Sequence, residues 1–507
     1  MKHNNIIWIA TEGNRFFKSN DGYGRLKIYD ELPFEFLNFK TAIASATSTL
    51  MSTSSFFTGM FSHDLYYDHS ALKDFETHSY FDELKKNGYT INSTFFCREG
   101  SEFYKKKLNV FRTDNEYKSG NGTVWNSFKH IMEKKFNFNG PNFLYIHFAP
   151  TNDQNNMVEN TLKYLKEKNL YENSFIIISS DHGYTDFGSY KPIGWLMKPR
   201  NHSIYSTEDC YRANLALKLP FENKNSSKIN INAQVGLFDI FETIFDYLNF
   251  KYGRENKRAI SFKKLLENPT DLNINSKFNE RLIRIDNRFI GQDYKITVIR
   301  NNNYELIINN QKYTLYKRDN SELNWKKSLK PHFDEYNFLA LKNFYEETQI
   351  FAKTNIQSLL IEKVDYSDLF KLNNKKIIMY NYGNSFLLNF CFDILSKTNF
   401  VKIMDYKLIK KNIDNFDLVL AIKSNDLNYS LDKIYHINKS KFKLFDVNFN
   451  FVNYKKHSII DKSKSDWRAY VGKNIYEKMV VFLILSWLQI LDYYLLWKTK
   501  ENYLKTN

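Results

Sequence analysis

Cysteine is scarce in this chain, which excludes a disulfide framework. The 507 residues include three cysteines, Cys97, Cys210 and Cys391, an odd number spread widely along the sequence. Such usage fits a reducing compartment. No charged and then apolar leader precedes the first predicted strand. We therefore expect no secretory signal peptide and a cytoplasmic location.

Nucleic-acid and nucleotide motifs are missing as well. The sequence has no Cys/His zinc spacing, no arginine-rich arm and no glycine-rich phosphate fingerprint, because the stretch NYGNS at 381–385 holds a lone glycine. We expect no nucleic-acid partner. Acidic residues are outnumbered, with 56 Asp and Glu against 72 Lys and Arg, a net charge of +16. That balance suits an anionic substrate, an anionic membrane face or a generally solvated lysine-rich surface.

Apolar side chains, in contrast, are plentiful enough to fill the cores of two or three domains. Hydrophobic residues make up 43% of the chain and aromatic residues 17%. Short apolar runs that predict strands alternate with amphipathic helical segments up to about residue 260. The predicted strands are 6–10, 39–45, 142–149, 174–180 and 213–220, and the helices are 48–59, 79–88, 157–170 and 232–250. This alternation predicts an α/β protein, a three-layer sandwich around a mostly parallel central sheet.

The remainder of the chain changes character twice. We predict a catalytic α/β domain at 1–265, followed by a small β-meander subdomain with Asn-rich turns at 266–350. Within it, the polar stretch 268–282 is interpreted as a linker. Apolar strand patterns return at 351–455, which predicts a Rossmann-like α/β module, and 456–507 is assigned to a C-terminal apolar helix.

The apolar stretch Met479–Trp497 in this last segment permits three interpretations. Its length is close to the ~20 residues of a spanning helix, but Ser486, Gln489 and Asp492 interrupt it. An Asp at mid-bilayer costs ~2.5–3.5 kcal/mol. We favour a packing or partner-binding helix. A peripheral membrane anchor, with lysines at its edge, is the second interpretation and a true span the third.

The most informative motif stands where a buried strand ends. The run SFIIISS is followed by Asp181-His182-Gly183, which places a carboxylate and an imidazole side by side at the carboxyl end of a strand. Ligands bind at that edge of an open α/β sheet. Carboxylate oxygen and imidazole nitrogen together suit a divalent cation of the zinc or manganese type. A turn-capping Asp with a neighbouring His is the simpler alternative for this pair taken alone.

Two further clusters stand in similar positions, where a predicted strand ends or a helix begins. One is NIIWIATEG, with Glu12, and the other is TSTLMSTSSFFTG, in which Thr49 stands nine residues before Thr58. Together with LYENSFIIISSDHG they resemble the alkaline phosphatase/sulfatase superfamily. The first is similar to the first metal-binding strand of that family, the second to its nucleophile helix and the third to its second metal strand. The resemblance covers roughly residues 4 to 330.

The identity of residue 49 indicates a branch of this family. Sulfatases need a Cys or Ser that is oxidised to formylglycine, and Thr49 cannot undergo that change. The resemblance is closer to the Thr-nucleophile phosphotransferases, such as lipoteichoic acid synthases and phosphoethanolamine transferases. It implies one divalent ion, Zn, Mn, Mg or Ca, held by Glu12, Thr49, Asp181 and His182. A cation lowers the pKa of a bound hydroxyl, which would make Thr49 a competent nucleophile.

Other polar side chains are candidates for contact with the substrate. The segment KPRNHSIY holds His202, which would protonate a leaving oxygen or bind phosphate, or is a surface histidine. Lys198 and Arg200 would contact a phosphate, or are solvated charges. His63 matches a common family position, although a structural role is the stronger interpretation. We interpret His147, within the strand LYIHF, as a core histidine rather than a ligand.

These residues predict a metal-dependent phosphotransferase that moves a substituted phosphate through a phospho-threonine. We expect a phosphate-containing donor, such as a nucleotide-activated one, and a glycan or lipid-linked sugar acceptor. The expected location is the cytoplasm, including the inner membrane surface. The alternatives are a phosphodiesterase or phosphatase, then a sulfuric ester hydrolase, and, from another class, a catalytically inactive binding protein.

Overall fold

The computed structural model divides the chain into two compact units. The first holds residues 1–65, 71–288 and 294–347, and the second holds 66–70, 289–293 and 348–507. The structure describes residues 4–17, 23–67, 70–71, 79–96, 104, 108–112, 120–184, 208–220, 229–253, 257–288, 295–309, 312–318, 329–332, 334–348, 374–380, 395–396, 399–404, 409, 412–422, 442–445 and 451–452.

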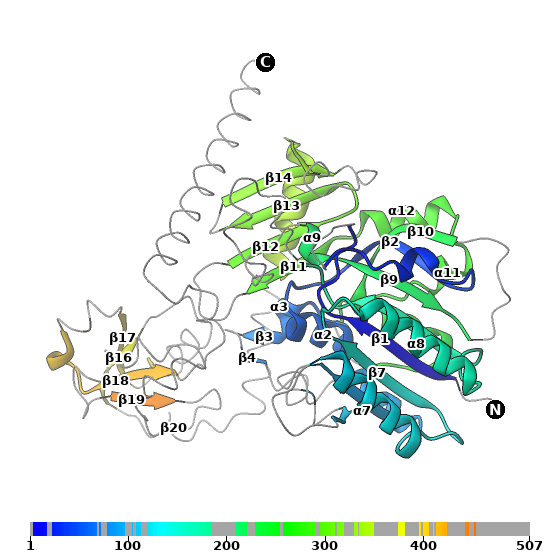
Figure 1. Ribbon diagram of the computed structural model, residues 1–507. Helices are drawn as coiled ribbons and strands as arrows, with labels where there is room; N and C mark the ends of the chain where they lie inside the picture. The colour runs from blue at the N-terminus through cyan, green and yellow to red at the C-terminus, as the bar shows by residue number, and fades with distance from the viewer. Residues whose placement is uncertain are drawn as a thin grey trace. The chain divides into compact units, whose positions relative to one another are not determined.

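An eight-stranded sheet forms the centre of the first unit, in the order β10-β2-β9-β8-β1-β7-β5-β6 (Figure 1). Its strands are β1 (Asn5–Thr11), β2 (Leu37–Ile43), β5 (Thr90–Phe95), β6 (Asn109–Val110), β7 (Asn142–Phe148), β8 (Ser174–Ser180), β9 (Arg212–Lys218) and β10 (Ile229–Gly236). β9 runs antiparallel to both of its neighbours, and the other pairs are parallel. The prediction of a mostly parallel α/β sheet is confirmed.

Alternate residues of β1 point into two separate cores. Ile6, Trp8 and Ala10 belong to a core with helices α2 (Thr49–Thr58), α5 (Tyr80–Lys86) and α10 (Ile240–Leu248). Ile7 and Ile9 belong to a second core with α7 (Asn121–Lys134) and α8 (Gln154–Glu167), which lie across that face in Figure 1. Because successive side chains of a strand face opposite ways, one apolar strand can serve both layers.

Further short helices among the described residues of this unit are α1 (Ile28–Glu31), α3 (Ser62–Leu65), α9 (Glu208–Tyr211), α11 (Lys263–Glu267) and α12 (Leu272–Glu280), with a 3₁₀ turn η2 at Leu237–Asp239. A longer helix covers 335–348, and all but its last residue belong to this unit. The two-residue strands β3 (Tyr66–Tyr67) and β4 (Ser70–Ala71) pair with each other.

Two secondary-structure predictions were wrong. Residues 232–236, which we assigned to a helix, belong to β10, and the helix α10 begins only at Ile240. The predicted linker 268–282 contains the helix α12. Its start is capped by Asp271, whose side chain accepts hydrogen bonds from the backbone N–H groups of Asn273 and Ile274. An Asp in this position satisfies two of the unpaired donors of a helix.

Two smaller sheets complete the description. An antiparallel sheet in chain order contains β11 (Ile283–Arg288), β12 (Lys295–Arg300), β13 (Tyr304–Asn309), β14 (Lys312–Arg318) and β15 (Leu329–Pro331), as the β-meander prediction requires. The second unit contains β17 (Phe400–Met404), β16 (Lys376–Tyr380), β18 (Leu418–Ile422), β19 (Phe442–Phe445) and β20 (Phe451–Val452), in that order. The first four are parallel, and a 3₁₀ turn η3 covers Ile413–Asn415.

The predicted domain boundaries and the Rossmann-like character of 351–455 stay predictions. The apolar stretch Met479–Trp497 lies outside the described residues. Among the residues that are described, no helix is long and apolar enough to cross a bilayer.

Candidate metal centre

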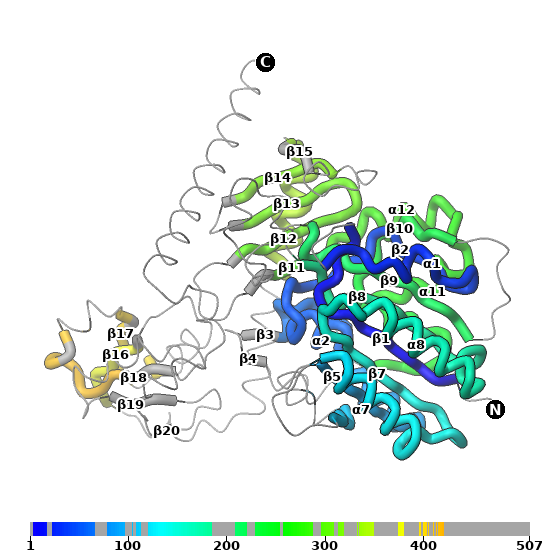
Figure 2. The backbone as a smooth tube through the Cα atoms, in the orientation of Figure 1, coloured from blue at the N-terminus to red at the C-terminus, as the bar shows by residue number. Residues whose placement is uncertain are grey.

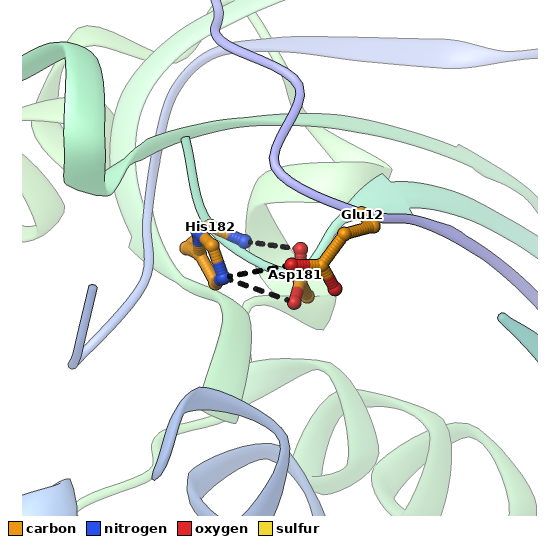
Figure 3. A group of neighbouring side chains, drawn as sticks. All are labelled: Glu12, Asp181 and His182. Atoms are coloured by element: carbon orange, nitrogen blue, oxygen red, sulfur yellow. Dashed lines mark hydrogen bonds and ion pairs between the residues drawn. The ribbon is translucent and has the colours of Figure 1, made fainter. Parts of the chain in front are cut away.

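The carboxyl ends of two adjacent parallel strands bring three predicted ligands together. β1 and β8 pair in register as far as Thr11 and Ser180, and Figure 2 shows them side by side. Glu12 follows β1 directly, and Asp181 and His182 follow β8. All three side chains are buried, and each offers a ligand atom within 4.8 Å of the others. Figure 3 shows them converging on one point.

Thr49 reaches this cluster from the first turn of α2. Its Oγ1 lies 3.0 Å from both carboxylate oxygens of Glu12 and 3.3 Å from Nε2 of His182. The preceding residue, Ser48, is extended and Thr49 opens the helix. The backbone N–H groups of a first helical turn point toward the amino terminus of the helix, which is where Thr49 lies. A helix amino terminus favours anionic groups.

Hydrogen bonds hold the ligand-bearing segments in place. Oδ1 of Asp181 accepts the backbone N–H groups of Gly13 and His182, each at 2.9 Å. The hydroxyl of Ser52, one turn along α2, donates to the carbonyl oxygen of Asp181 at 2.6 Å. Nδ1 of His182 lies 2.5 Å from the carbonyl oxygen of Gly183. Because that oxygen only accepts, Nδ1 carries a proton, and Nε2 is the nitrogen that would bind a cation.

The spacing of these atoms fits a single small cation. Ligand atoms of a tetrahedral ion with bonds of about 2.0–2.1 Å lie about 3.3 Å apart. Here Nε2 of His182 is 3.5 Å from Oε1 of Glu12 and 3.2 Å from Oδ2 of Asp181. Oδ2 of Asp181 is also buried without a hydrogen-bond partner. Two carboxylates, one imidazole and one hydroxyl are a donor set suited to zinc or manganese. The residues therefore fit the predicted ion.

The pKa values of the three groups show how strongly they interact. Burial and then the charge of Glu12 raise the pKa of Asp181 to about 6. Burial alone would lower the pKa of His182, but the carboxylates of Asp181 and Glu12 outweigh it and raise that pKa to about 9. Burial alone would raise the pKa of Glu12, yet hydrogen bonds and attraction from His147 and His182 hold it well below its ordinary value. A dication would relieve the repulsion between the two carboxylates.

His147 belongs to this cluster, which the sequence did not indicate. It is fully buried in β7, as expected of a core histidine, but its Nε2 lies 3.3 Å from Oε2 of Glu12 and 3.8 Å from Oδ2 of Asp181. β7 is the other neighbour of β1 in the sheet. A histidine at the end of a strand that flanks the ligand strand is the signal that would have identified it.

The remaining candidates are placed differently. His63 is buried in α3 with Nδ1 4.0 Å from Oδ1 of Asp286 in β11, and both the substrate-binding and the structural interpretation of it stay predictions. Lys198, Arg200 and His202 lie outside the described residues, in the segment between Tyr184 and Glu208. Their predicted roles stay predictions.

Solved structures with a similar fold cover about 70% of this chain. BT4656, solved with its substrate D-glucosamine-2-N,6-O-disulfate, is 14% identical, with a TM-score of 0.52 over 70% of this chain and 99% of that chain. The putative sulfatase yidJ from Bacteroides fragilis is 13% identical, with a TM-score of 0.50 over 70% and 98%. A protein in the alkaline phosphatase superfamily from Vibrio parahaemolyticus is 12% identical, with a TM-score of 0.50 over 71% and 88%.

No protein-family model and no curated protein matches the sequence. The structural matches show that the chain has the alkaline phosphatase/sulfatase superfamily fold, which confirms the resemblance seen in the sequence.

Proposed function

We propose that this protein is a metal-dependent phosphotransferase that uses Thr49 as its nucleophile. The observation that supports the proposal is the contact of one hydroxyl with two of the three buried ligand candidates. The Thr49 hydroxyl lies within 3.3 Å of both Glu12 and His182, at the amino terminus of a ten-residue helix. A threonine that only capped the helix would have no need of buried acidic and imidazole partners.

The reaction is a double displacement. In the first step, Oγ1 of Thr49 forms a bond to phosphorus, the bond from phosphorus to the donor's leaving oxygen breaks, and the hydroxyl proton is released to solvent. In the second step, the oxygen of an acceptor hydroxyl forms a bond to phosphorus, the bond from phosphorus to Oγ1 breaks, the acceptor's proton is released to solvent and Oγ1 takes up a proton from solvent. A phosphoryl group in transfer carries charge on its outer oxygens, so stabilisation of that charge dominates catalysis.

Each residue of the site has a separate task. A divalent cation, when bound, supplies a lower pKa for the hydroxyl and offsets charge on the phosphoryl oxygens. Glu12 accepts the hydrogen bond of the Thr49 hydroxyl and so orients its lone pairs. The backbone N–H groups at the amino terminus of α2 receive an oxygen of the transferring group. We assign protonation of the leaving oxygen to His202, as predicted from the sequence.

The residue type at position 49 argues against sulfate ester hydrolysis. BT4656, whose substrate is a disulfated glucosamine, shares the fold at 14% identity. Thr49, however, cannot be converted to the formylglycine that sulfatases need. We propose a glycan or lipid-linked sugar as the acceptor. The proposed donor contains phosphate, and nucleotide-activated donors belong to this class. The proposed location is the cytoplasm. Water in place of the acceptor would make the same site a phosphodiesterase.

The test is a trapping experiment with a matched pair of variants. The purified chain is incubated with Zn²⁺ or Mn²⁺ and a panel of phosphodiesters, sulfate esters and nucleotide-linked donors. Mass spectrometry of the Thr49 peptide reports the covalent intermediate, and Thr49→Ala and Thr49→Ser are treated alike. We expect an added phosphoryl group on Thr49 in the wild-type chain, and none in Thr49→Ala.

The outcomes separate the functions considered. Phosphoryl release to water alone identifies a phosphodiesterase, whereas transfer to an added sugar alcohol identifies the transferase. Release of sulfate by both wild type and Thr49→Ala would overturn the proposal. If none of the divalent cations tested binds or activates the protein, the result would favour a binding protein without catalysis.

A further inference from the structure

The short helix α9 packs directly on the glycine that follows the candidate ligands. A Cβ atom placed on Gly183 would lie 1.9 Å from the carbonyl oxygen of Asp209, so only glycine fits between the two segments. The backbone N–H of Gly183 donates to the carbonyl oxygen of Cys210 at 2.8 Å. The position of α9 therefore determines where Gly183 lies.

Gly183 in turn orients His182. Its carbonyl oxygen accepts the hydrogen bond from Nδ1 of His182 at 2.5 Å. That hydrogen bond selects the tautomer whose Nε2 faces Glu12 and Asp181. The bond partners of the non-ligating nitrogen commonly set both the orientation of a ligand histidine and its basicity.

Three arginines anchor α9 through the fully buried Glu208. Oε1 of Glu208 accepts from Arg212 at 3.1 Å and from Arg318, and it lies 3.6 Å from Arg300. Arg300 is the last residue of β12 and Arg318 the last of β14, so the small antiparallel sheet supplies two of the three cations. Glu305 of β13 binds Arg318 at 2.8 Å, and it accepts from the hydroxyl of Tyr211 of α9 at 2.5 Å.

Holding α9 against the small antiparallel sheet through these buried ion pairs carries a high desolvation cost. Three guanidinium groups and two carboxylates are buried at 0% to 6% exposure. Removing such charges from water costs free energy that ion pairing only partly returns, so apolar packing would hold the junction with less cost. What buried ion pairs supply instead is a defined geometry. The desolvation cost of these charges is explained if the position of α9 must be fixed.

We infer that Glu208 is a positioning residue for the metal centre, through which the small antiparallel sheet sets the orientation of His182. The route runs from Arg318 and Arg300 to Glu208, then through the Cys210 carbonyl and Gly183 to the imidazole. This inference rests on the proposed metal site. It assigns to the small sheet a role in that site, although no residue of the sheet is a candidate ligand.

The experiment compares Glu208→Gln with Asp239→Asn in the full chain. Asp239 is a matched control, because it is a fully buried carboxylate that pairs with Arg281 at 2.5 Å but makes no contact with α9 among its described partners. Both variants lose one buried ion-pair partner. Zn²⁺ affinity is measured by competition with a chromophoric chelator. In the metal-free protein at about pH 10, above the pKa of His182, ¹⁵N NMR of labelled histidine reports the tautomer of the neutral ring.

We expect Glu208→Gln to bind Zn²⁺ about 10–100-fold more weakly and to lose the fixed Nδ1–H tautomer. Asp239→Asn should keep both properties while losing thermal stability. Wild-type affinity and tautomer in a folded Glu208→Gln would overturn the inference. If that variant does not fold, Arg318→Lys takes its place with the same two readouts and the same criterion. If the wild-type chain binds no divalent cation, neither Zn²⁺ nor Mn²⁺, Mg²⁺ or Ca²⁺, the proposed function fails, and the tautomer still decides the positioning role.

Discussion

Replacing Asp181 with Asn should stabilise the metal-free protein while removing its response to metal. The pKa of Asp181 rises from its ordinary 3.8 to about 6 because the carboxylate is buried beside Glu12. Each pH unit corresponds to about 1.36 kcal/mol, so the ionised side chain costs the folded state about 3 kcal/mol. An amide of the same shape can keep the hydrogen bonds from Gly13 and His182 and can donate from the position of Oδ2.

The sign of the pH dependence follows from the direction of this shift. An acid whose pKa is raised by folding binds its proton more tightly in the folded state, so stability falls as the pH rises from about 4 to about 6 and stays lower above that. Asp181→Asn has no carboxyl group at this position, so its stability does not fall in this way as the pH rises. Near pH 4 wild type and variant should therefore be close in stability, and at pH 7.5 the variant should be more stable by up to about 3 kcal/mol.

Guanidinium unfolding at pH 4.5 and 7.5 in the presence of a chelator measures the difference. Added Zn²⁺ at a thousandfold excess over Kd should then reverse the order, since wild type gains about 4.1 kcal/mol and Asp181→Asn gains nothing. A variant less stable than wild type at pH 7.5 without metal would refute the reasoning. It would mean that attraction from His182, not burial beside Glu12, governs the energy of Asp181.

Substitutions at three further positions test separate parts of the structure. Thr49→Ala should lower initial transfer rates by about 10³-fold or more, with wild-type thermal stability, whereas Thr49→Ser should keep measurable transfer. Phe57→Ala should lower the free energy of unfolding by about 3–5 kcal/mol, seen as a lower denaturant midpoint, because this fully buried ring contacts Trp8 and Tyr145. Gly183→Ala should weaken Zn²⁺ binding in the chelator competition, since its Cβ would meet the carbonyl of Asp209 at 1.9 Å. Unchanged metal affinity would show that α9 yields without disturbing His182.

The ligand cluster could be predicted because its members follow strands whose sequences are unmistakable. Both β1 and β8 contain an unbroken apolar run, Ile6–Ala10 and Phe175–Ile178, and every residue in each strand is buried. Strands of this kind belong to parallel sheets, whose carboxyl ends meet at one edge. Glu12 and the Asp181-His182 pair then fall at that edge whatever the rest of the fold. Adjacent strands bring them within bonding distance of one ion.

His147 was interpreted differently because strand order is not a local property. Residues Asn142–Phe148 form an equally clear buried strand, and a histidine inside it is fully buried whichever strand lies beside it. Only the pairing of β7 with β1, in the register Ala10 with His147, brings the imidazole beside Glu12. The helix α12 was missed for another reason, because its polar face resembles a linker and its single local signal is the capping Asp271.

The helix α2 contributes both to the packing of the core and to the position of the proposed nucleophile Thr49. β2, from which α2 follows, is separated from β1 by β9 and β8 in the sheet. The helix returns over β1 because Phe56 stacks on Trp8 at 5.2 Å and Phe57 meets the same ring edge-on at 6.2 Å. Each helical residue turns about 100°, so a slip of one residue in this aromatic contact would carry Thr49 to another face of α2. The distance of 3.0 Å between Thr49 and Glu12 therefore depends on the aromatic core beneath them as much as on the polar residues themselves.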